Sequence, residues 1–198
     1  MKLPEGIRFG REVCGDLTQA ERREWWLANG LGGYAAGTLA GTLTRRYHGL
    51  LFAPVNPPLG RHLVFAKADA TLVDGERIFP LHSNRWGGGA IEPEGHVHLE
   101  SFRLEGRMPV WRYVIGDLAI EARVWMEPGA HTTYAAWRLE PGPRADDLRL
   151  RVKFLVNARD QHGSASPASL NPVIEGDARE LRVIHPGGSR SISVPGAV

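Results

Sequence analysis

The chain of 198 residues is 42% hydrophobic, and its 24 basic and 22 acidic residues leave a formal net charge of +2. The basic residues are scattered among the acidic ones without forming a stripe, which argues against a nucleic-acid-binding protein. The single cysteine, Cys14, excludes an internal disulfide framework and a cysteine-based zinc site, and we expect it to be a small buried hydrophobe.

The N-terminal segment predicts one strand and one short helical turn. Residues 7–13 alternate between apolar and polar side chains, as in a strand with one buried face. Thr18 stands three positions before Glu21, a spacing that resembles the capping box at the start of a helix, so a helical turn is expected within residues 17–24. No basic segment followed by an apolar run opens the chain, and we therefore expect a cytoplasmic protein.

Residues 24–54, EWWLANGLGGYAAGTLAGTLTRRYHGLLFAP, are the most informative stretch of the chain. Residues 29–34 predict a glycine-rich turn, because glycine reaches backbone angles that are closed to other residues. The residues after the turn alternate, with threonines on one side, and predict a strand in which Gly33, Gly37 and Gly41 share one face. Such a face would let another backbone or a flat ligand approach closely.

Nucleotide-binding motifs and a membrane helix are alternative explanations of the same glycines, and both fit the sequence less well than a turn followed by a strand. Residues 30–35 imitate a dinucleotide fingerprint, but an alternating segment follows where a helix should open. Residues 32–37 have the spacing of a P-loop, yet Thr38 stands where the phosphate-binding lysine belongs. Threonines and arginines also cut the apolar run far short of the roughly 20 residues that span a bilayer.

Aromatic and basic side chains surround the glycine-rich turn. Trp25 and Trp26 are adjacent, so in a strand they face opposite ways and one of them can be buried while the other is presented. Aromatic faces stack on the C–H surfaces of pyranose rings, and arginine and histidine donate to hydroxyls, so this group suits a sugar or a domain contact. The candidate residues in this stretch are Trp26, Asn29, Tyr34, Arg45, Arg46, Tyr47 and His48.

The rest of the chain predicts short strands separated by turn residues. Residues 54–60 predict a proline-rich loop, and residues 82–95 predict a polar, glycine-rich one. Further strands are expected at residues 61–73, 76–81, 96–105, 109–116, 118–127, 130–140, 148–156, 180–185 and 191–194, with tight turns at 74–75 and 116–117. Strands at this spacing indicate an all-β fold, a single antiparallel β-sandwich over residues 1–198 with little helix.

Other groups of residues give weaker signals. Three pairs of acids could serve glycoside hydrolysis, but any β-domain with this many acids offers such pairs: Glu92 with Glu94, Glu121 with Glu127, and Asp146 with Asp147. His96 and His98 would share one strand face as half of a metal site, without an evident third ligand. The serines near His162 form no nucleophile elbow.

We expect no catalytic residue, metal or cofactor in this chain. Three tryptophans inside alternating runs are expected in the core: Trp111, Trp125 and Trp137.

The runs WLANGLGGYAAGT and TRRYHGLL, followed by Gly60-Arg61 and by NARDQH at residues 157–162, resemble the N-terminal domain of bacterial and archaeal glycogen debranching enzymes of the amylo-α-1,6-glucosidase type. The resemblance covers the chain from about residue 24 to about residue 162. It implies a β-sandwich whose hydrolytic carboxylates lie on a separate, C-terminal helical domain. It also adds three candidate substrate or interface residues: Arg159, Asp160 and His162.

By this resemblance the chain is a non-catalytic N-terminal domain that packs on the helical catalytic domain and helps to shape the α-glucan cleft in glycogen breakdown. The partners it implies are glycogen or maltodextrin and the catalytic domain, with neither nucleic acid nor membrane, and the chain alone is expected to be inactive. A free-standing carbohydrate-binding module and a purely structural domain remain alternatives. Family members tend to carry two glutamates where this chain has Asp69 and Ala70, so we assign no acidic role there.

Overall fold

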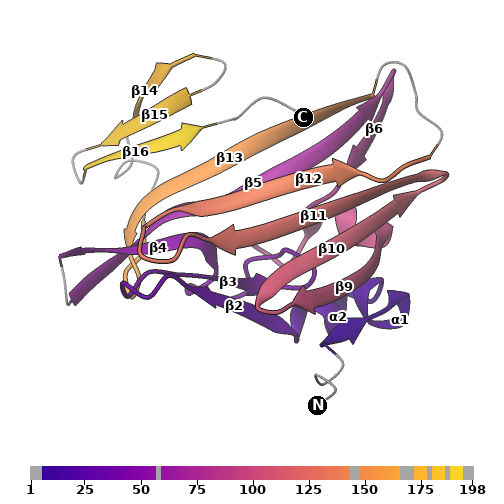
Figure 1. Ribbon diagram of the computed structural model, residues 1–198, viewed down its shortest axis with the longest axis horizontal. Coiled ribbons are helices and arrows are strands. Elements are labelled where there is room, and N and C mark those ends of the chain that lie inside the picture. Colours follow the sequence, from indigo (N-terminus) through magenta and orange to yellow (C-terminus); the bar gives the residue numbers. More distant parts are fainter. Residues whose placement is uncertain are drawn as a thin grey trace.

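The computed structural model describes residues 6–56, 59–142, 148–165, 172–177, 180–185 and 188–193. Two large antiparallel sheets pack face to face, with short helices beside them, and confirm the all-β sandwich (Figure 1). In the part of the chain that is described, no helix is long and apolar enough to cross a membrane.

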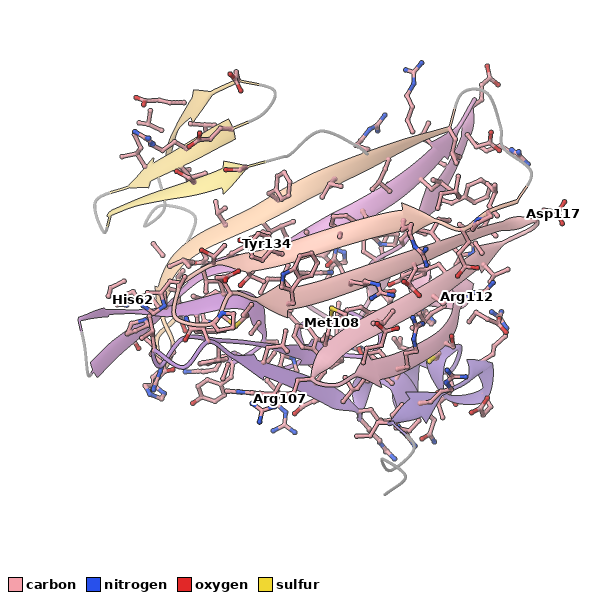
Figure 2. All side chains as sticks on the ribbon, viewed as in Figure 1. His62, Arg107, Met108, Arg112, Asp117 and Tyr134 are labelled. Atoms are coloured by element: carbon pink, nitrogen blue, oxygen red, sulfur yellow. The ribbon has the colours of Figure 1, made fainter. Side chains whose placement is uncertain are left out.

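The first sheet has five strands in an order that follows the chain. They are β1 (Arg8–Phe9), β9 (Leu99–Glu105), β10 (Met108–Ile115), β11 (Leu118–Met126) and β12 (Thr133–Leu139). The strands expected at residues 109–116, 118–127 and 130–140 are thus confirmed, with small shifts of their ends. Figure 2 shows Asp117, in the turn between β10 and β11, and His62, on β5, at opposite ends of the sandwich.

The second sheet contains the glycine-rich stretch. Its order is β13 (Leu148–Asp160), β5 (Leu59–Asp74), β4 (Gly49–Asn56), β3 (Tyr34–Thr38) and β2 (Glu24–Ala28), and β6 (Arg77–Pro80) also pairs with β5. The hairpin expected at residues 74–75 joins β5 to β6, where Gly75 has a φ of +57°. A separate three-stranded sheet holds β14 (Val173–Gly176), β15 (Glu180–His185) and β16 (Gly188–Ser193), of which β14 was not anticipated.

The core lies between the two large sheets. Trp25 on β2 meets Trp111 on β10 edge to face, with ring centroids 5.5 Å apart, and both rings are buried. Burial of a large apolar side chain stabilises the fold by about 1.5–3 kcal/mol, so this contact between sheets is a major source of stability. The expectation that Trp111 is a core residue is confirmed.

The other two tryptophans of the first sheet differ from each other. Trp137 is partly buried against the core. Trp125 is only half-buried, because β11 turns Val124 and Met126 inward and Trp125 to the outer face. There it stacks on Tyr134 at 5.0 Å, so its assignment to the core was wrong.

Near the N-terminus the strand expected at residues 7–13 was wrong for its second half. Only β1 is extended, and α1 (Arg11–Cys14) follows, because over four or five residues an alternating pattern also fits one helical turn. Cys14 is fully buried, as expected, and burial raises the pKa of its thiol to about 11. The helical turn expected within residues 17–24 is α2 (Leu17–Glu21), but its N-cap is Asp16, whose carboxylate accepts from the Gln19 amide at 3.1 Å.

Two boundaries in the second sheet also differ from expectation. The strand expected to reach residue 43 ends at Thr38, so Gly41, with a φ of +74°, lies in a turn away from the face of Gly37. The loop expected at residues 54–60 is mostly strand, since β4 and β5 stay paired as far as Asn56 and Leu59. Pro54 is tolerated because the pairing of β4 with β3 ends at Phe52, which leaves Pro54 with a strand on one side only.

The segment expected to be a loop at residues 82–95 contains a two-stranded sheet, β7 (Ser83–Arg85) with β8 (Ile91–Glu94). The strand expected from residue 96 begins only at Leu99, because η1 (Gly95–His98) is a 3-10 helix. His96 and His98 therefore do not share a strand face, and the buried His96 contacts the Ser83 hydroxyl through Nδ1 at 3.3 Å. Among the described residues, no group of three or more His, Cys, Asp or Glu side chains could hold a metal ion.

Candidate functional site

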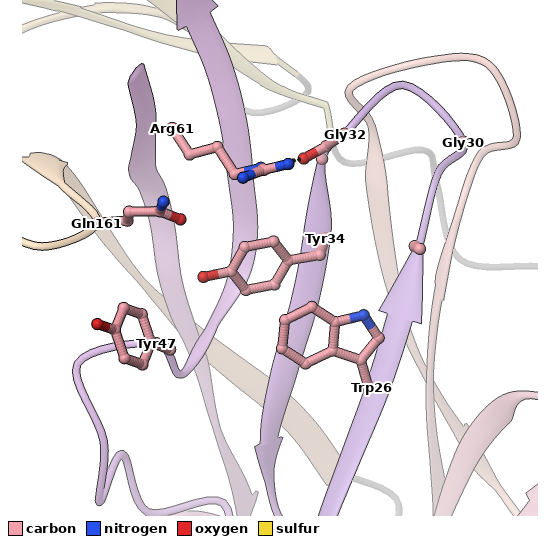
Figure 3. A pocket seen from close by; sticks show the side chains of 9 residues that line it. Trp26, Gly30, Gly32, Tyr34, Tyr47, Arg61 and Gln161 are labelled. Carbon is pink, nitrogen blue, oxygen red and sulfur yellow. Dashed lines mark hydrogen bonds between the residues drawn. The ribbon is translucent and has the colours of Figure 1, made fainter. Parts of the chain in front are cut away.

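An open pocket of about 540 Å³ lies at the end of the second sheet, where the glycine-rich turn, the start of β5 and the end of β13 come together (Figure 3). The turn contributes backbone, and the sheet contributes aromatic rings. The lining residues are Trp26, Ala28, Gly30, Gly32, Gly33, Tyr34, Tyr47, Arg61 and Gln161.

A stack of three aromatic rings forms one wall of the pocket. Trp26 on β2 stacks on Tyr34 on β3, with centroids 4.2 Å apart and planes 14° apart. Tyr34 stacks in turn on Phe52 on β4 at 4.5 Å and 8°. Tyr34 and Phe52 are buried, whereas 57% of Trp26 is exposed. Tyr34 therefore has an aromatic ring on each face. Trp26 is fixed on one face by Tyr34, and its other face is open to solvent. The expectation that one of the two adjacent tryptophans is buried and the other presented is confirmed.

Asn29 holds the glycine-rich turn that borders this wall. Its side-chain oxygen accepts from the amides of Leu31, at 2.9 Å, and Gly33, at 3.0 Å. Its side-chain nitrogen donates to the Ala130 carbonyl at 2.8 Å, which ties the turn to the loop between β11 and β12. Asn29 is 2% exposed, so it supports the pocket without lining it. The expected turn is confirmed.

Two glycines of the predicted floor, Gly33 and Gly37, are packed against side chains of the protein itself. A Cβ added at Gly37 would lie 3.1 Å from the Trp25 ring, and one at Gly33 would lie 2.6 Å from the Asn29 side-chain nitrogen. These glycines therefore admit core and turn side chains. The aromatic stack, and not a bare backbone, is the flat surface that this pocket offers.

Arg61 closes the pocket on the side opposite Trp26 (Figure 3). Its Nε donates to the Gly32 carbonyl at 2.6 Å, and its own carbonyl accepts from the Gln161 amide at 2.9 Å. Arg61 and Gln161 were not among the candidates. In the sequence, only their positions within the runs GR and NARDQH pointed to these two residues. The pairing of β5 with β4 and with β13 is what brings them to the pocket, and the sequence does not show that pairing directly.

A clasp between two distant segments forms the rim beside Tyr47. Arg159 donates through Nη2 to the Arg46 carbonyl and through Nη1 to the carbonyls of Gln161 and Gly163. Arg46 donates in return to the His162 carbonyl. The Tyr47 hydroxyl lies 3.1 Å from His162 Nδ1. The structure thus brings together candidates that lie more than a hundred positions apart in the sequence.

The remaining three candidates lie around this clasp. Asp160 is exposed and accepts from the His162 amide at 2.8 Å, and this bond lowers the pKa of its carboxyl. His48 is buried, with Nε2 3.2 Å from the Glu24 carboxylate, and burial lowers its pKa although Glu24 opposes the shift. Arg45 pairs with the same carboxylate at 2.6 Å. His48 and Arg45 therefore brace the loop, and neither lines the pocket.

A second, smaller cavity of about 100 Å³ lies between the two sheets, with Lys67 and His82 in its lining. Lys67 is buried and its Nζ contacts three acceptors: Asp69 at 2.8 Å, the Ser83 carbonyl at 2.9 Å and Asn84 Oδ1 at 2.6 Å. The contacts with Ser83 and Asn84 are hydrogen bonds and the contact with Asp69 is an ion pair, and burial lowers the pKa of Lys67 in spite of Asp69. This group has the geometry of an internal brace.

The acid pairs considered for hydrolysis are not set up for it in the part of the chain that the structure describes. Glu121 is surrounded by arginines on the outer face of the first sheet, and Glu127 lies beyond the end of β11. Glu92 and Glu94 belong to β8 of the small hairpin. Asp146 and Asp147 lie outside the described residues.

Comparison with known protein families gives one match over most of the chain. The family described as glycogen debranching enzyme N terminal matches residues 23–192. No curated protein and no solved structure matches the chain significantly.

Proposed function

The chain belongs to the glycogen debranching enzyme N-terminal family, and on that premise we propose that its aromatic pocket contacts α-glucan while the domain packs on a helical catalytic domain in glycogen breakdown. The domain contributes binding surface and no hydrolytic carboxylate. The observation that carries this proposal is the exposed Trp26 ring, backed by Tyr34 and Phe52 beside a pocket large enough for a sugar ring.

The physical reason is the cost of ordering a binding surface. A free tryptophan loses side-chain entropy when it stacks on a sugar, whereas Trp26 is already fixed by Tyr34. Its exposed face can meet the C–H surface of a pyranose. Arg61, Tyr47 and Gln161 stand across the pocket and can bind the hydroxyls.

Calorimetric titration with maltoheptaose tests the proposal. We expect saturable binding to the chain, and we expect Trp26→Ala to weaken it roughly tenfold, since an aromatic stacking contact contributes about 0.5–1.5 kcal/mol. The matched control is Trp86→Ala, which removes a tryptophan of similar exposure from the β7–β8 hairpin. Equal binding by the parent chain and Trp26→Ala would contradict a glucan contact at Trp26, and glucose release from branched limit dextrin by the pure chain would contradict a non-catalytic role.

A structural contact with the catalytic domain is the second candidate function of this surface. Leu31 is 50% exposed in the glycine-rich turn, between two glycines that line the pocket together with the exposed Trp26. Exposed apolar groups that gather in one place are typical of protein interfaces. If this candidate is correct, Trp26→Ala weakens association with the helical domain in sedimentation experiments, and maltoheptaose gives no heat with the chain.

A further inference from the structure

The pocket contains hydrogen-bond donors but no carboxylate. The polar side chains among its nine lining residues are those of Trp26, Tyr34, Tyr47, Arg61 and Gln161, and none is Asp or Glu. Arginine and indole groups only donate, whereas the two tyrosine hydroxyls and the Gln161 amide can both donate and accept. No lining side chain carries a negative charge, so an anionic acceptor group on a ligand would meet donors here and no carboxylate.

Tyr34 adds a donor to this lining. The residue as a whole is 6% exposed, but its hydroxyl oxygen is not among the fully buried atoms, and this hydroxyl makes no hydrogen bond to a described residue. Figure 3 shows this hydroxyl pointing into the space between Tyr47 and Gln161. Because this hydroxyl faces the pocket, it can donate to an acceptor group of a bound ligand.

Positive charge collects around the same hydroxyl. Arg61 lines the pocket together with Tyr34, and Arg159 lies in the rim beside it. Burial raises the pKa of Tyr34 to about 12, and the charges of Arg61 and Arg159 oppose this rise. Burial also lowers the pKa of Arg159, and the neighbouring charge of Arg46 adds to the effect. None of these arginines forms a salt bridge with a carboxylate that the structure describes, unlike Arg103 and Arg123 on the outer face of the first sheet.

We propose that the pocket binds a phosphate monoester carried by a glucose unit, with the sugar against the free face of Trp26 and the phosphate oxygens accepting from Arg61, Tyr34 and Tyr47. This inference rests on the proposed function, because it requires that the pocket contacts sugar. Only Nε of Arg61 is engaged by a described residue, at Gly32, so its two terminal nitrogens can donate side by side. A phosphate group has three strong acceptor oxygens, one for each of these three side chains, whereas a carboxylate has only two acceptor oxygens.

The test compares the affinities of the chain for maltoheptaose and for maltoheptaose with one 6-phosphate, at low salt and neutral pH. We expect the phosphorylated sugar to bind at least tenfold more tightly, and we expect this advantage to shrink as sodium chloride is added. Free glucose 6-phosphate is titrated in parallel, to tell a soluble sugar phosphate from an ester on a glucan, and either source supports the proposal. Equal affinity for the phosphorylated and neutral heptaose overturns the inference and leaves the proposed function standing, whereas binding of neither sugar contradicts both.

Three variants locate the effect. Arg61 also faces the sugar hydroxyls, so the readout for Arg61→Gln is the ratio of its affinities for phosphorylated and neutral maltoheptaose, and this ratio should lose most of the phosphate advantage. Arg46→Gln, which does not contact Gly32, should lose part of the advantage. Arg77→Gln is the control, because Arg77 lies beyond the opposite end of β5, roughly 40 Å along the strand from Arg61. A full advantage in both Arg61→Gln and Arg46→Gln, or an equal gain for a heptaose carrying a glucuronic acid, contradicts the phosphate site.

Discussion

At the scale of single residues, Asn29 is the side chain on which the shape of the pocket depends. Its amide group satisfies two backbone amides of the turn and the Ala130 carbonyl in the loop between β11 and β12. Asn29→Ala leaves these buried groups without partners, and we expect the free energy of unfolding to fall by about 2–4 kcal/mol. Urea denaturation followed by circular dichroism measures the loss. Leu31→Ala is the control from the same turn, because Leu31 is half exposed and uses only its backbone toward Asn29. A similar loss in both variants would contradict a specific role of the Asn29 amide.

The candidate site was predictable where neighbours in sequence are also neighbours in space. Two adjacent tryptophans before a glycine-rich turn were enough to predict that one ring is presented, since strand geometry alone decides it. The role of Arg61 was not predictable in this way. Arg61 reaches Gly32 only because β4, which lies between them in sequence, pairs with β5 as far as Asn56 and Leu59. Family membership is now established, whereas the roles of the individual pocket residues remain predictions.

At the scale of the element, a group of charged residues joins the strands of the first sheet on their outer face. Glu121 on β11 is 4% exposed and accepts from Arg103 on β9 and Arg123 on β11, with Arg138 on β12 at 3.6 Å. These side chains cross above Val110 on β10, which pairs with both Arg103 and Arg123 and is fully buried. The group therefore covers an apolar residue as well as joining strands.

Replacing Glu121 tests this network. Burial works against ionisation of Glu121, but the hydrogen bonds from Arg103 and Arg123 outweigh it and hold the pKa of the carboxyl below its ordinary value. We expect Glu121→Gln to lower the free energy of unfolding by about 1.5–3 kcal/mol at pH 7, the contribution of hydrogen bonds to charged groups. The control is Glu140→Gln, which removes a more exposed ion pair with Arg112 and should cost less than about 1 kcal/mol. Equal urea midpoints for the two variants would contradict the special position of Glu121.

Prediction of the elements succeeded for long alternating runs and failed for short ones. A run such as β11 spans nine residues, over which a period of two cannot be mistaken for a helical period. At α1, four residues are compatible with both periods, and the helix is decided by contacts that bring Val13 and Cys14 to the core. The proline-rich segment before β5 was assigned to a loop because proline is usually excluded from paired strands, and only the position of Pro54 beyond the last β3 pair makes it acceptable.

At the scale of the whole molecule, the fold shields several histidine side chains from water. Among the histidines whose side chains the structure describes, four have a pKa below the ordinary value, and burial is the largest cause in each: His48, His82, His96 and His98. Because the unfolded chain binds protons near pH 6.5 and the folded chain binds them only at lower pH, protons stabilise the unfolded state. The stabilising effect of the neutral histidines is complete well above pH 6.5 and is lost as the pH falls through that value toward the folded pKa.

This linkage predicts that the chain loses stability in mild acid, before its ion-paired carboxylates are protonated. Each histidine contributes a slope of up to about 1.4 kcal/mol per pH unit while it titrates only in the unfolded chain, so the combined effect is large. Urea midpoints measured at pH 8, 7, 6 and 5.5 should fall steadily below pH 7, and His98→Gln should have a shallower dependence than the parent chain. A flat midpoint over this range would show that the four side chains take up protons equally in both states, and that water reaches them in the folded sandwich. Since His48 braces the loop beside the pocket through Glu24, loss of sugar binding should accompany the loss of stability as the pH falls.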